Sequence, residues 1–399
     1  MNDEDQGMSI AEGPLTNVTV LDFSRVLAGP FATAMLCDVG ADVIKVESPA
    51  GDDYRHVGPF VQGRSALFDF VNRGKRSIVL DLKDQAGRDT AERLAQSADV
   101  VVENFRPGVA DKLGIGYERL STIKPDLIYL SISGFGAVSP LRDRAAYDII
   151  IQAESGMMSI TGDPAGDPTL VGDSIADVTS GLYGAWAIST ALWHRERTGR
   201  GCRIDLAMFD ALLSLMPTAA CRYLATGEIP RRVGNRHPLS APFGAYRSAD
   251  SHVVIAVLNE NLFREFAKAI GKPELANDRR FEDDAARAEN EPALREFIEQ
   301  WSLSRTTKEI VQILARSGIP AAAINSVADA IDNEHTSTRS LFRSGALTPL
   351  PEQPAHFSGM RRGRPVRAPH HGEHTQEVLS SIGQTSPRAK VGAEYDEGI

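Results

Sequence analysis

Three segments decide the fold class: Val18-Thr-Val-Leu-Asp-Phe23, Ser24-Arg-Val-Leu-Ala-Gly-Pro30 and, after an apolar periodic stretch and Gly40, Ala41-Asp-Val-Ile-Lys-Val-Glu47. They predict a strand, a loop, a helix that stops at a glycine, and a second strand. The alternation continues, with strands predicted at Ser77–Leu82, Asp99–Glu103 and Leu127–Ser133 and helices at Gln85–Ser97 and Tyr117–Lys124. This pattern predicts an α/β fold with a Rossmann-like, mostly parallel sheet, which binds ligands at the carboxyl ends of its strands.

The second half of the chain has a different pattern. A long helix is predicted from about Asp177 to Arg197, followed by a strand over 202–208, a helix over 209–226 and a linker over 227–242. Strands and helices then predict a smaller α+β domain over 225–330. The Pro-, Arg- and His-rich stretch that follows predicts an arm that returns to the first domain. We therefore expect a large domain over 14–224, completed by the arm 331–399, and a small domain over 225–330.

Composition and charge exclude several classes of protein. The chain has 399 residues, 42% of them hydrophobic, which is typical of a globular protein of two domains. Its net charge of −10, without a basic block, argues against nucleic acid and anionic membrane as partners. Cys37, Cys202 and Cys221 are too widely spaced to indicate a disulfide framework or a metal site. The acidic N-terminus is unlike a targeting peptide and no apolar run is long enough to span a membrane, so we expect a cytoplasmic protein.

Basic residues gather between residues 55 and 112, several of them beside predicted strand ends, where they could neutralise phosphates. They are Arg64, Arg73, Lys75, Arg76, Lys83, Arg106 and Lys112. A solvated charged face is the alternative interpretation. The chain has neither a G-x-G-x-x-G nor a G-x-x-x-x-G-K-[ST] motif, which argues against a standard dinucleotide site and a P-loop.

Asp177 is the carboxylate that stands out. It opens the long predicted helix and is followed by Ser180, Gly181 and Gly184, whose small side chains would let a ligand or another chain approach the backbone. A carboxylate at a helix N-terminus is held ionised, as a nucleophile must be. An N-cap of the same helix is the alternative, and both interpretations predict the same local structure.

Three other groups have structural alternatives. Tyr147-Asp148 lies in a loop, where such a pair is more often structural than catalytic. Arg231, Arg236 and His237 could bind a carboxylate, although linker charge is the simpler interpretation. His370-His-Gly-Glu-His374 lacks a second ligand cluster, so we predict no metal site.

Taken together, the motifs resemble the class III CoA-transferase family, which includes formyl-CoA and carnitine CoA-transferases and α-methylacyl-CoA racemases. The resemblance covers about residues 15–380. It is carried by Asp22-Phe-Ser-Arg-Val-Leu-Ala-Gly-Pro30, Gly40–Glu47, Asn72-Arg-Gly-Lys-Arg-Ser-Ile78, Leu80-Asp-Leu-Lys83, Glu103-Asn-Phe-Arg-Pro-Gly108, Ser131-Ile-Ser-Gly-Phe-Gly136, Gln152-Ala, Thr161-Gly and Arg197-Thr-Gly-Arg-Gly201.

The resemblance implies Asp177 as the nucleophile and no permanently bound cofactor, with coenzyme A and acyl-CoA as substrates. CoA would pass from an acyl-CoA thioester to a free carboxylic acid, such as a short dicarboxylate, through an aspartyl anhydride and an aspartyl-CoA thioester. It also implies an interlocked homodimer. The family's CoA-binding positions fall on Val26, Leu27, Ala28, Leu80, Lys83, Asn104, Phe105, Arg106, Lys112, Arg144, Ala145 and Tyr147.

Two positions depart from relatives in the family. Several members have Arg where this chain has Ser48, so a phosphate contact is absent or comes from another residue. The racemases have His where this chain has Tyr147, and a tyrosine is poorly suited to exchanging an α-proton near neutral pH. A transferase is therefore favoured over an acyl-CoA racemase or epimerase, and the match at Asp177 favours it over a non-catalytic acyl-CoA-binding protein.

Overall fold

The computed structural model describes residues 13–344, 347–358 and 367–383. The N-terminal tail and parts of the predicted arm lie outside these residues. The chain divides into two compact units, which are described separately. The smaller unit comprises Gly156–Val171 and Thr218–Thr338, and the larger unit comprises the other described residues.

The larger unit is built on a six-stranded sheet in which every neighbouring pair is parallel. Its order is β5-β2-β1-β6-β7-β8. The strands are β1 Thr19–Asp22, β2 Asp42–Glu47, β5 Arg76–Val79, β6 Val100–Glu103, β7 Ile128–Ser133 and β8 Cys202–Ala207. Numbered along the chain, this is the order 3-2-1-4-5-6 of a doubly wound dinucleotide-type fold. The predicted α/β class and mostly parallel sheet are confirmed.

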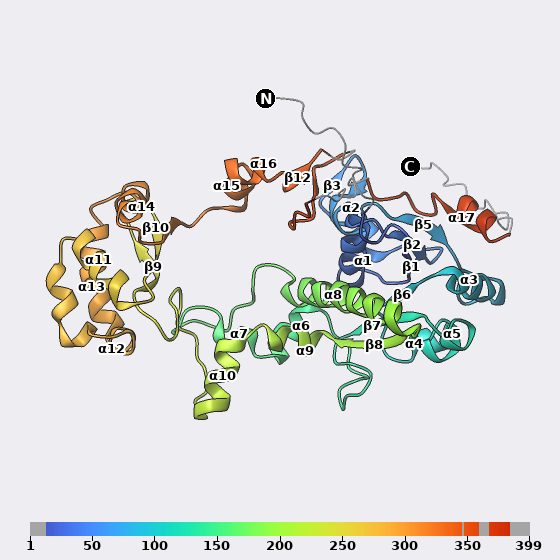
Figure 1. The fold of residues 1–399 in the computed structure, drawn as a ribbon, viewed down its shortest axis with the longest axis horizontal. Coiled ribbons are helices and arrows are strands. Elements are labelled where there is room, and N and C mark those ends of the chain that lie inside the picture. The colour runs from blue at the N-terminus through green and yellow to red at the C-terminus, as the bar shows by residue number, and fades with distance from the viewer. Residues whose placement is uncertain (1–12, 345–346, 359–366, 384–399) are drawn as a thin grey trace, which may run out of the picture. The chain divides into compact units, whose positions relative to one another are not determined.

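Helices cover both faces of this sheet. On one face α1 (Ala28–Asp38) and α8 (Ile175–Thr198) pack against each other and against the strands (Figure 1). On the other face, apolar residues of α3 (Gln85–Ser97), α5 (Tyr117–Ile123) and α17 (Thr375–Ser381) form one buried cluster with the strands. The remaining elements of this unit are η1 Asp53–His56, β3 Phe60–Val61, β4 Arg64–Ser65, α2 Ala66–Asn72, α4 Val109–Lys112, α6 Asp148–Glu154, α9 Met208–Ser214, β12 Phe342–Arg343 and β13 Leu350–Pro351.

Two helix predictions are corrected. The long helix begins at Ile175 rather than Asp177, because the carboxylate of Asp148 binds its free N–H groups from outside the segment. The helix predicted over 209–226 is two helices, α9 and α10 (Pro217–Thr226). Proline has no N–H and so cannot continue the ladder of α9.

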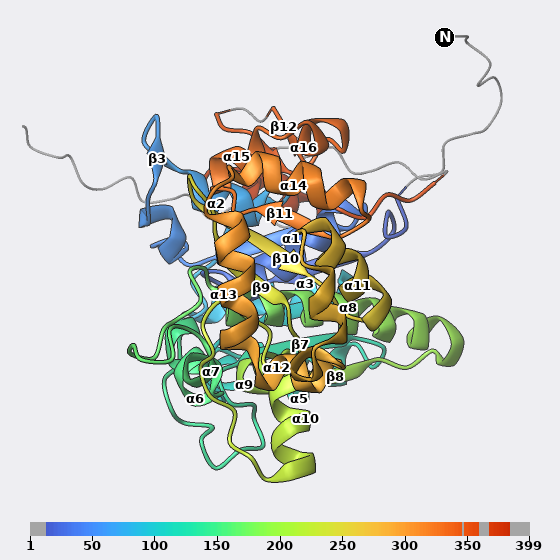
Figure 2. The same ribbon diagram turned by 90° about the vertical axis from the view of Figure 1, so that its left-hand side faces the viewer.

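The smaller unit has its own core. Its three-stranded antiparallel sheet has the order β11-β10-β9, with β9 Phe243–Arg247, β10 His252–Ala256 and β11 Ala321–Ala323. Figure 2 shows α11 (Glu260–Ala269), α13 (Glu291–Ser302) and α14 (Thr307–Arg316) around these strands. Its other elements are α7 Met157–Ile160, α10, η2 Pro273–Asn277, η3 Arg279–Phe281, α12 Asp284–Glu289, α15 Val327–Ile331 and α16 Glu334–Thr338.

Candidate active site

The loops after β1 and β6 meet where the strand order of the large sheet reverses. There the backbone N–H of Arg25 donates to the Asn104 side chain at 2.8 Å, and the Asn104 amide donates back to the Arg25 carbonyl at 2.7 Å. Sheets of this type bind ligands at this point. The paired hydrogen bonds therefore fix two loops of a candidate site to each other.

A pocket of 420 Å³, which we call the central pocket, opens at this point. The loops after β1, β6 and β7 and the first turn of α8 surround it. Its lining comprises Arg25, Val26, Ala28, Asp53, Asn104, Phe105, Arg106, Pro107, Val109, Ile132, Ser133, Gly134, Arg142, Arg144, Ala145, Ala146, Tyr147, Asp177 and Met208.

A second pocket of 380 Å³, the side pocket, shares Arg25, Phe105 and Val109 with the central pocket. Its other walls come from the strand ends of β1, β2 and β5 and from α4. They comprise Phe23, Lys45, Val46, Glu47, Ser48, Gly51, Asp52, Leu80, Asp81, Leu82, Lys83 and Leu113. Two adjoining pockets with common walls suit an elongated ligand.

Asp177 lies in the first turn of α8, where Asp148 caps the helix. The Asp148 carboxylate accepts from the backbone N–H groups of Ala176 at 2.7 Å and Asp177 at 3.3 Å. Burial, and next the carboxylate of Asp148, raise the pKa of Asp177 to about 7, although a hydrogen bond from the Ala28 backbone N–H opposes the rise. The expectation that the helix terminus holds Asp177 ionised is thus corrected, because desolvation outweighs the helix end at this site.

Glycines bring Asp177 close to the first loop. A Cβ atom at Gly181 would lie 2.8 Å from Phe31 Cδ1 and 2.9 Å from the Ala28 carbonyl oxygen. At Gly184 it would lie 3.0 Å from Leu130 Cδ2. Gly181 therefore lets α8 pack directly on the start of α1, and Gly184 lets it pack on β7.

The central pocket contains four arginines. Arg25 lies 3.4 Å from the carboxylate of Asp53, and Arg144 is ion-paired with Glu154 at 2.6 Å. Arg142 lies 3.8 Å from the carboxylate of its neighbour Asp143. Arg106 is exposed at the pocket wall. The cluster suits an anionic ligand, since guanidinium groups match phosphate and carboxylate geometry.

The predicted site residues divide between the two pockets. The central pocket is lined by Val26, Ala28, Asn104, Phe105, Arg106, Arg144, Ala145, Tyr147 and Asp177. The side pocket is lined by Leu80, Lys83 and again Phe105. Leu27 is buried and lines neither of them. Lys112 is exposed on α4 and also lines neither. Ser48 is a wall residue of the side pocket.

Several lining residues were not predicted from the sequence. Arg25 stands beside Val26 in the first loop, and Asp52 follows Gly51 just beyond a strand end. Position at a strand end was the available signal for both. Arg142 and Asp53 also lie in loops that follow predicted strands, which was the available signal for them.

Arg231 and Arg236 lie in the smaller unit, where they line a different pocket of 640 Å³ together with Arg222, Glu228 and Glu289. The ring of His237 packs 5.2 Å from that of Phe243. Within the described part of the chain, no three His, Cys, Asp or Glu side chains are grouped to hold a metal ion. None of the described helices is long and apolar enough to cross a membrane.

Comparisons with known proteins give a consistent result. The family model for CoA-transferase family III matches residues 15–375. The acetyl-CoA:oxalate CoA-transferase of Acetobacter aceti is 43% identical, covering 87% of this chain and 90% of its own. The succinate–glutarate CoA-transferase of Agrobacterium fabrum is 38% identical, covering 92% and 96%. A crystal structure of a CaiB/BaiF family protein from Brucella suis superposes with a TM-score of 0.84 at 40% identity, covering 93% of this chain and all of its own.

Proposed function

The chain belongs to CoA-transferase family III, and from this premise we propose that it transfers coenzyme A between carboxylic acids through covalent adducts of Asp177. The observation that carries the proposal is the place of this carboxyl group. Asp177 lines the central pocket beside the Ala28 N–H and four arginines, at the carboxyl edge of the sheet.

The chemistry needs four exchanges at carbonyl carbons. The Asp177 carboxylate attacks the thioester carbonyl, which forms an anhydride C–O bond, breaks the C–S bond and releases the CoA thiolate. The thiolate attacks the aspartyl carbonyl, giving an aspartyl-CoA thioester and the free donor acid. The acceptor carboxylate then displaces the thiolate to form a second anhydride, and the thiolate attacks its acyl carbonyl, which regenerates Asp177. No net proton is consumed. Covalent catalysis thus replaces one difficult exchange of CoA between two acids by several simpler displacements.

Two features support binding of CoA across both pockets. The shared wall of Arg25, Phe105 and Val109 gives a long nucleotide thioester a continuous path. Lys83 in the side pocket and Arg106 and Arg144 in the central pocket supply positive charge for phosphates. In the proposed orientation the thioester end of CoA reaches Asp177.

We further propose that the acceptor is a short dicarboxylate. Both relatives described above carry the name of a dicarboxylic acid, oxalate in one and glutarate in the other. Assays with acetyl-CoA and succinyl-CoA against matched mono- and dicarboxylic acids test this. Turnover with monocarboxylic acids alone would exclude it.

The covalent step is tested by mass spectrometry of the protein incubated with acyl-CoA, with and without hydroxylamine. We expect an adduct on Asp177 that hydroxylamine converts to a hydroxamate, and its loss in Asp177→Asn. The matched control is Asp173→Asn, since Asp173 is exposed four residues earlier and does not line the central pocket. An adduct that persists in Asp177→Asn would disprove the assignment.

A racemase is the second candidate function. It predicts uptake of deuterium at the α-carbon of an acyl-CoA without exchange of labelled acid. Tyr147 is 72% exposed at the mouth of the central pocket, and a phenol is a weak base near neutral pH. Label exchange without deuterium uptake is the result that favours the transferase.

We also propose that the protein acts as a homodimer. Leu182, Trp186 and Trp193 lie along one stripe of α8, and both tryptophans are 65% exposed. A stripe of large apolar side chains is typical of an interface. Sedimentation of the wild type and of Trp186→Glu tests this, with a dimer expected for the wild type and a weakened dimer for the variant.

A further inference from the structure

Val26 has a backbone conformation that its side chain disfavours. Its φ is 67°, in the left-handed region. A β-branched residue is a genuine outlier there, and such strain persists only where the surrounding structure enforces it. Two residues further on, the backbone N–H of Ala28 interacts with the Asp177 carboxyl group and lowers its pKa, and both residues line the central pocket. The conformation at Val26 therefore determines how this N–H meets the carboxyl group.

One buried carboxylate oxygen binds the backbone at this position. Asp52 Oδ1 accepts from the backbone N–H of Val26 at 3.2 Å and from that of Tyr54 at 2.9 Å. A single carboxylate oxygen thus ties the loop after β1 to the turn after β2. Tyr54 also lies near Asp177, whose charge contributes to raising the pKa of the phenol to about 12, after the larger effect of burial.

Asp52 is itself firmly held. Its other oxygen lies 2.7 Å from Lys45 Nζ in an ion pair whose two side chains are each 1% exposed. The same ammonium group donates to the Ser24 carbonyl at 2.9 Å, at the start of the first loop. Lys45 therefore holds this loop at its start, and Asp52 holds it at Val26.

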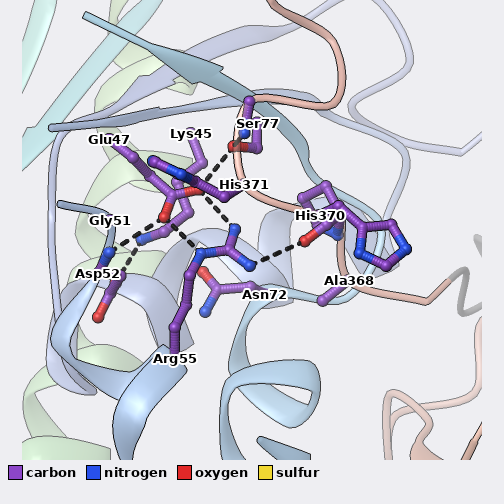
Figure 3. Close-up of polar contacts among 12 residues, drawn as sticks. Lys45, Glu47, Gly51, Asp52, Arg55, Asn72, Ser77, Ala368, His370 and His371 are labelled. Carbon is purple, nitrogen blue, oxygen red and sulfur yellow. Dashed lines mark hydrogen bonds and ion pairs between the residues drawn. The ribbon is translucent and has the colours of Figure 1, made fainter. Parts of the chain in front are cut away.

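A second set of contacts holds the turn after β2 that carries Asp52 (Figure 3). The backbone N–H of Asp52 donates to Glu47 at 3.1 Å, and Arg55 donates to both oxygens of Glu47 at 2.7 and 2.6 Å. Arg55 also donates to the Pro369 carbonyl at 3.2 Å. The His371 ring lies 3.0 Å from the Ser48 carbonyl. Contacts from a segment more than 300 residues away thus help to place Asp52.

We propose that Asp52 is a positioning residue that holds the loop of residues 24–28 in the shape that directs the Ala28 N–H at Asp177. The inference rests on the proposed role of Asp177 as nucleophile. Asp52 acts through Val26 rather than on the substrate. Its removal lets Val26 relax toward negative φ, which turns the next peptides and withdraws the N–H from the carboxyl group.

A double-mutant cycle tests this, because glycine adopts positive φ without a clamp. The measurement is the single-turnover rate of formation of the Asp177 adduct at saturating acyl-CoA. Asp52→Ala is expected to slow this rate about tenfold or more when residue 26 is valine, and less than about threefold in the Val26→Gly background. Equal losses in the two backgrounds would overturn the proposal.

The matched control is Asp38→Ala. Asp38 is another buried carboxylate with a cationic partner, Arg73, whose Nε lies 2.9 Å from Asp38 Oδ1 in a contact away from both pockets. Its removal is expected to lower the melting temperature while the rate loss is the same in both Val26 backgrounds. A merely structural role for Asp52 predicts this same pattern.

Asp52→Asn supplies the comparison if Asp52→Ala fails to fold. Its side-chain oxygen can still accept from Val26, but its amide cannot pair with Lys45, so any rate loss is expected to be the same whether residue 26 is valine or glycine, and a loss confined to the valine background overturns the proposal. The wild-type protein separates failure of the proposed function from failure of the positioning role of Asp52. Absence of any wild-type adduct contradicts the proposed function, whereas a wild-type adduct without coupling between positions 26 and 52 contradicts only the positioning role.

Discussion

Replacement of Asp148 by asparagine is expected to shift the pH dependence of catalysis to lower pH. The reacting form of Asp177 is the carboxylate, so activity should fall as the pH drops through its pKa of about 7. Burial is the larger cause of the elevated pKa and the Asp148 carboxylate is the next. Removal of that charge should lower the pKa by roughly one unit, or about 1.4 kcal/mol.

Asparagine is chosen because its side-chain oxygen can still accept from the N–H of Ala176, which Asp148 Oδ1 meets at 2.7 Å. The cap of α8 is therefore retained while the charge is lost. The assay is kcat/KM for acyl-CoA from pH 5 to 9 at constant ionic strength, with Asp173→Asn as the control that should keep the wild-type midpoint. A midpoint that stays near 7 or moves upward in Asp148→Asn would refute the electrostatic argument.

Three further predictions concern the same site. Arg106→Ala should raise KM for acyl-CoA roughly 10- to 100-fold with little change in kcat, and steady-state kinetics would count against a phosphate contact if KM stayed the same. Asp177→Asn should raise the free energy of unfolding at pH 8 by about 1–3 kcal/mol, because the folded wild type keeps a proton that the unfolded chain releases between pH 4 and 7. In denaturant titrations this gain in stability should vanish near pH 4, and an equal gain at both pH values would contradict the argument. Gly181→Ala should lower the free energy of unfolding by about 1–3 kcal/mol and abolish most activity, since the added Cβ would lie 2.9 Å from the Ala28 carbonyl oxygen. A variant with the melting temperature and turnover of the wild type would show that the contact relaxes freely.

Periodicity predicted all six strands of the large sheet, because most of them are short, buried and β-branched. The strands expected from the sequence agree with β1, β2, β5, β6, β7 and β8 to within a few residues. Local patterns are sufficient for such elements, since burial on both faces leaves a continuous apolar run.

Features set by distant residues could not be predicted in this way. The start of α8 depends on Asp148, which lies 28 residues before the Ala176 N–H that it binds. Val26 has a left-handed conformation, and its N–H donates to Asp52 in another loop. The pKa of Asp177 depends on burial by elements from several parts of the chain. The family position of Lys112 likewise did not indicate that this residue would line neither pocket.

The edge strand β5 has a consequence for how the protein is made. Its backbone pairs with residues near the other end of the chain: His374 N–H donates to the Ser77 carbonyl at 2.8 Å, and Val79 N–H donates to Thr375 Oγ1 at 3.1 Å, across separations of almost 300 residues. At 5–20 residues per second, the ribosome needs roughly 15 to 60 s to deliver these partners. During that time the nascent sheet has an open edge beside the future side pocket, which is the kind of surface that recruits foreign strands or chaperones.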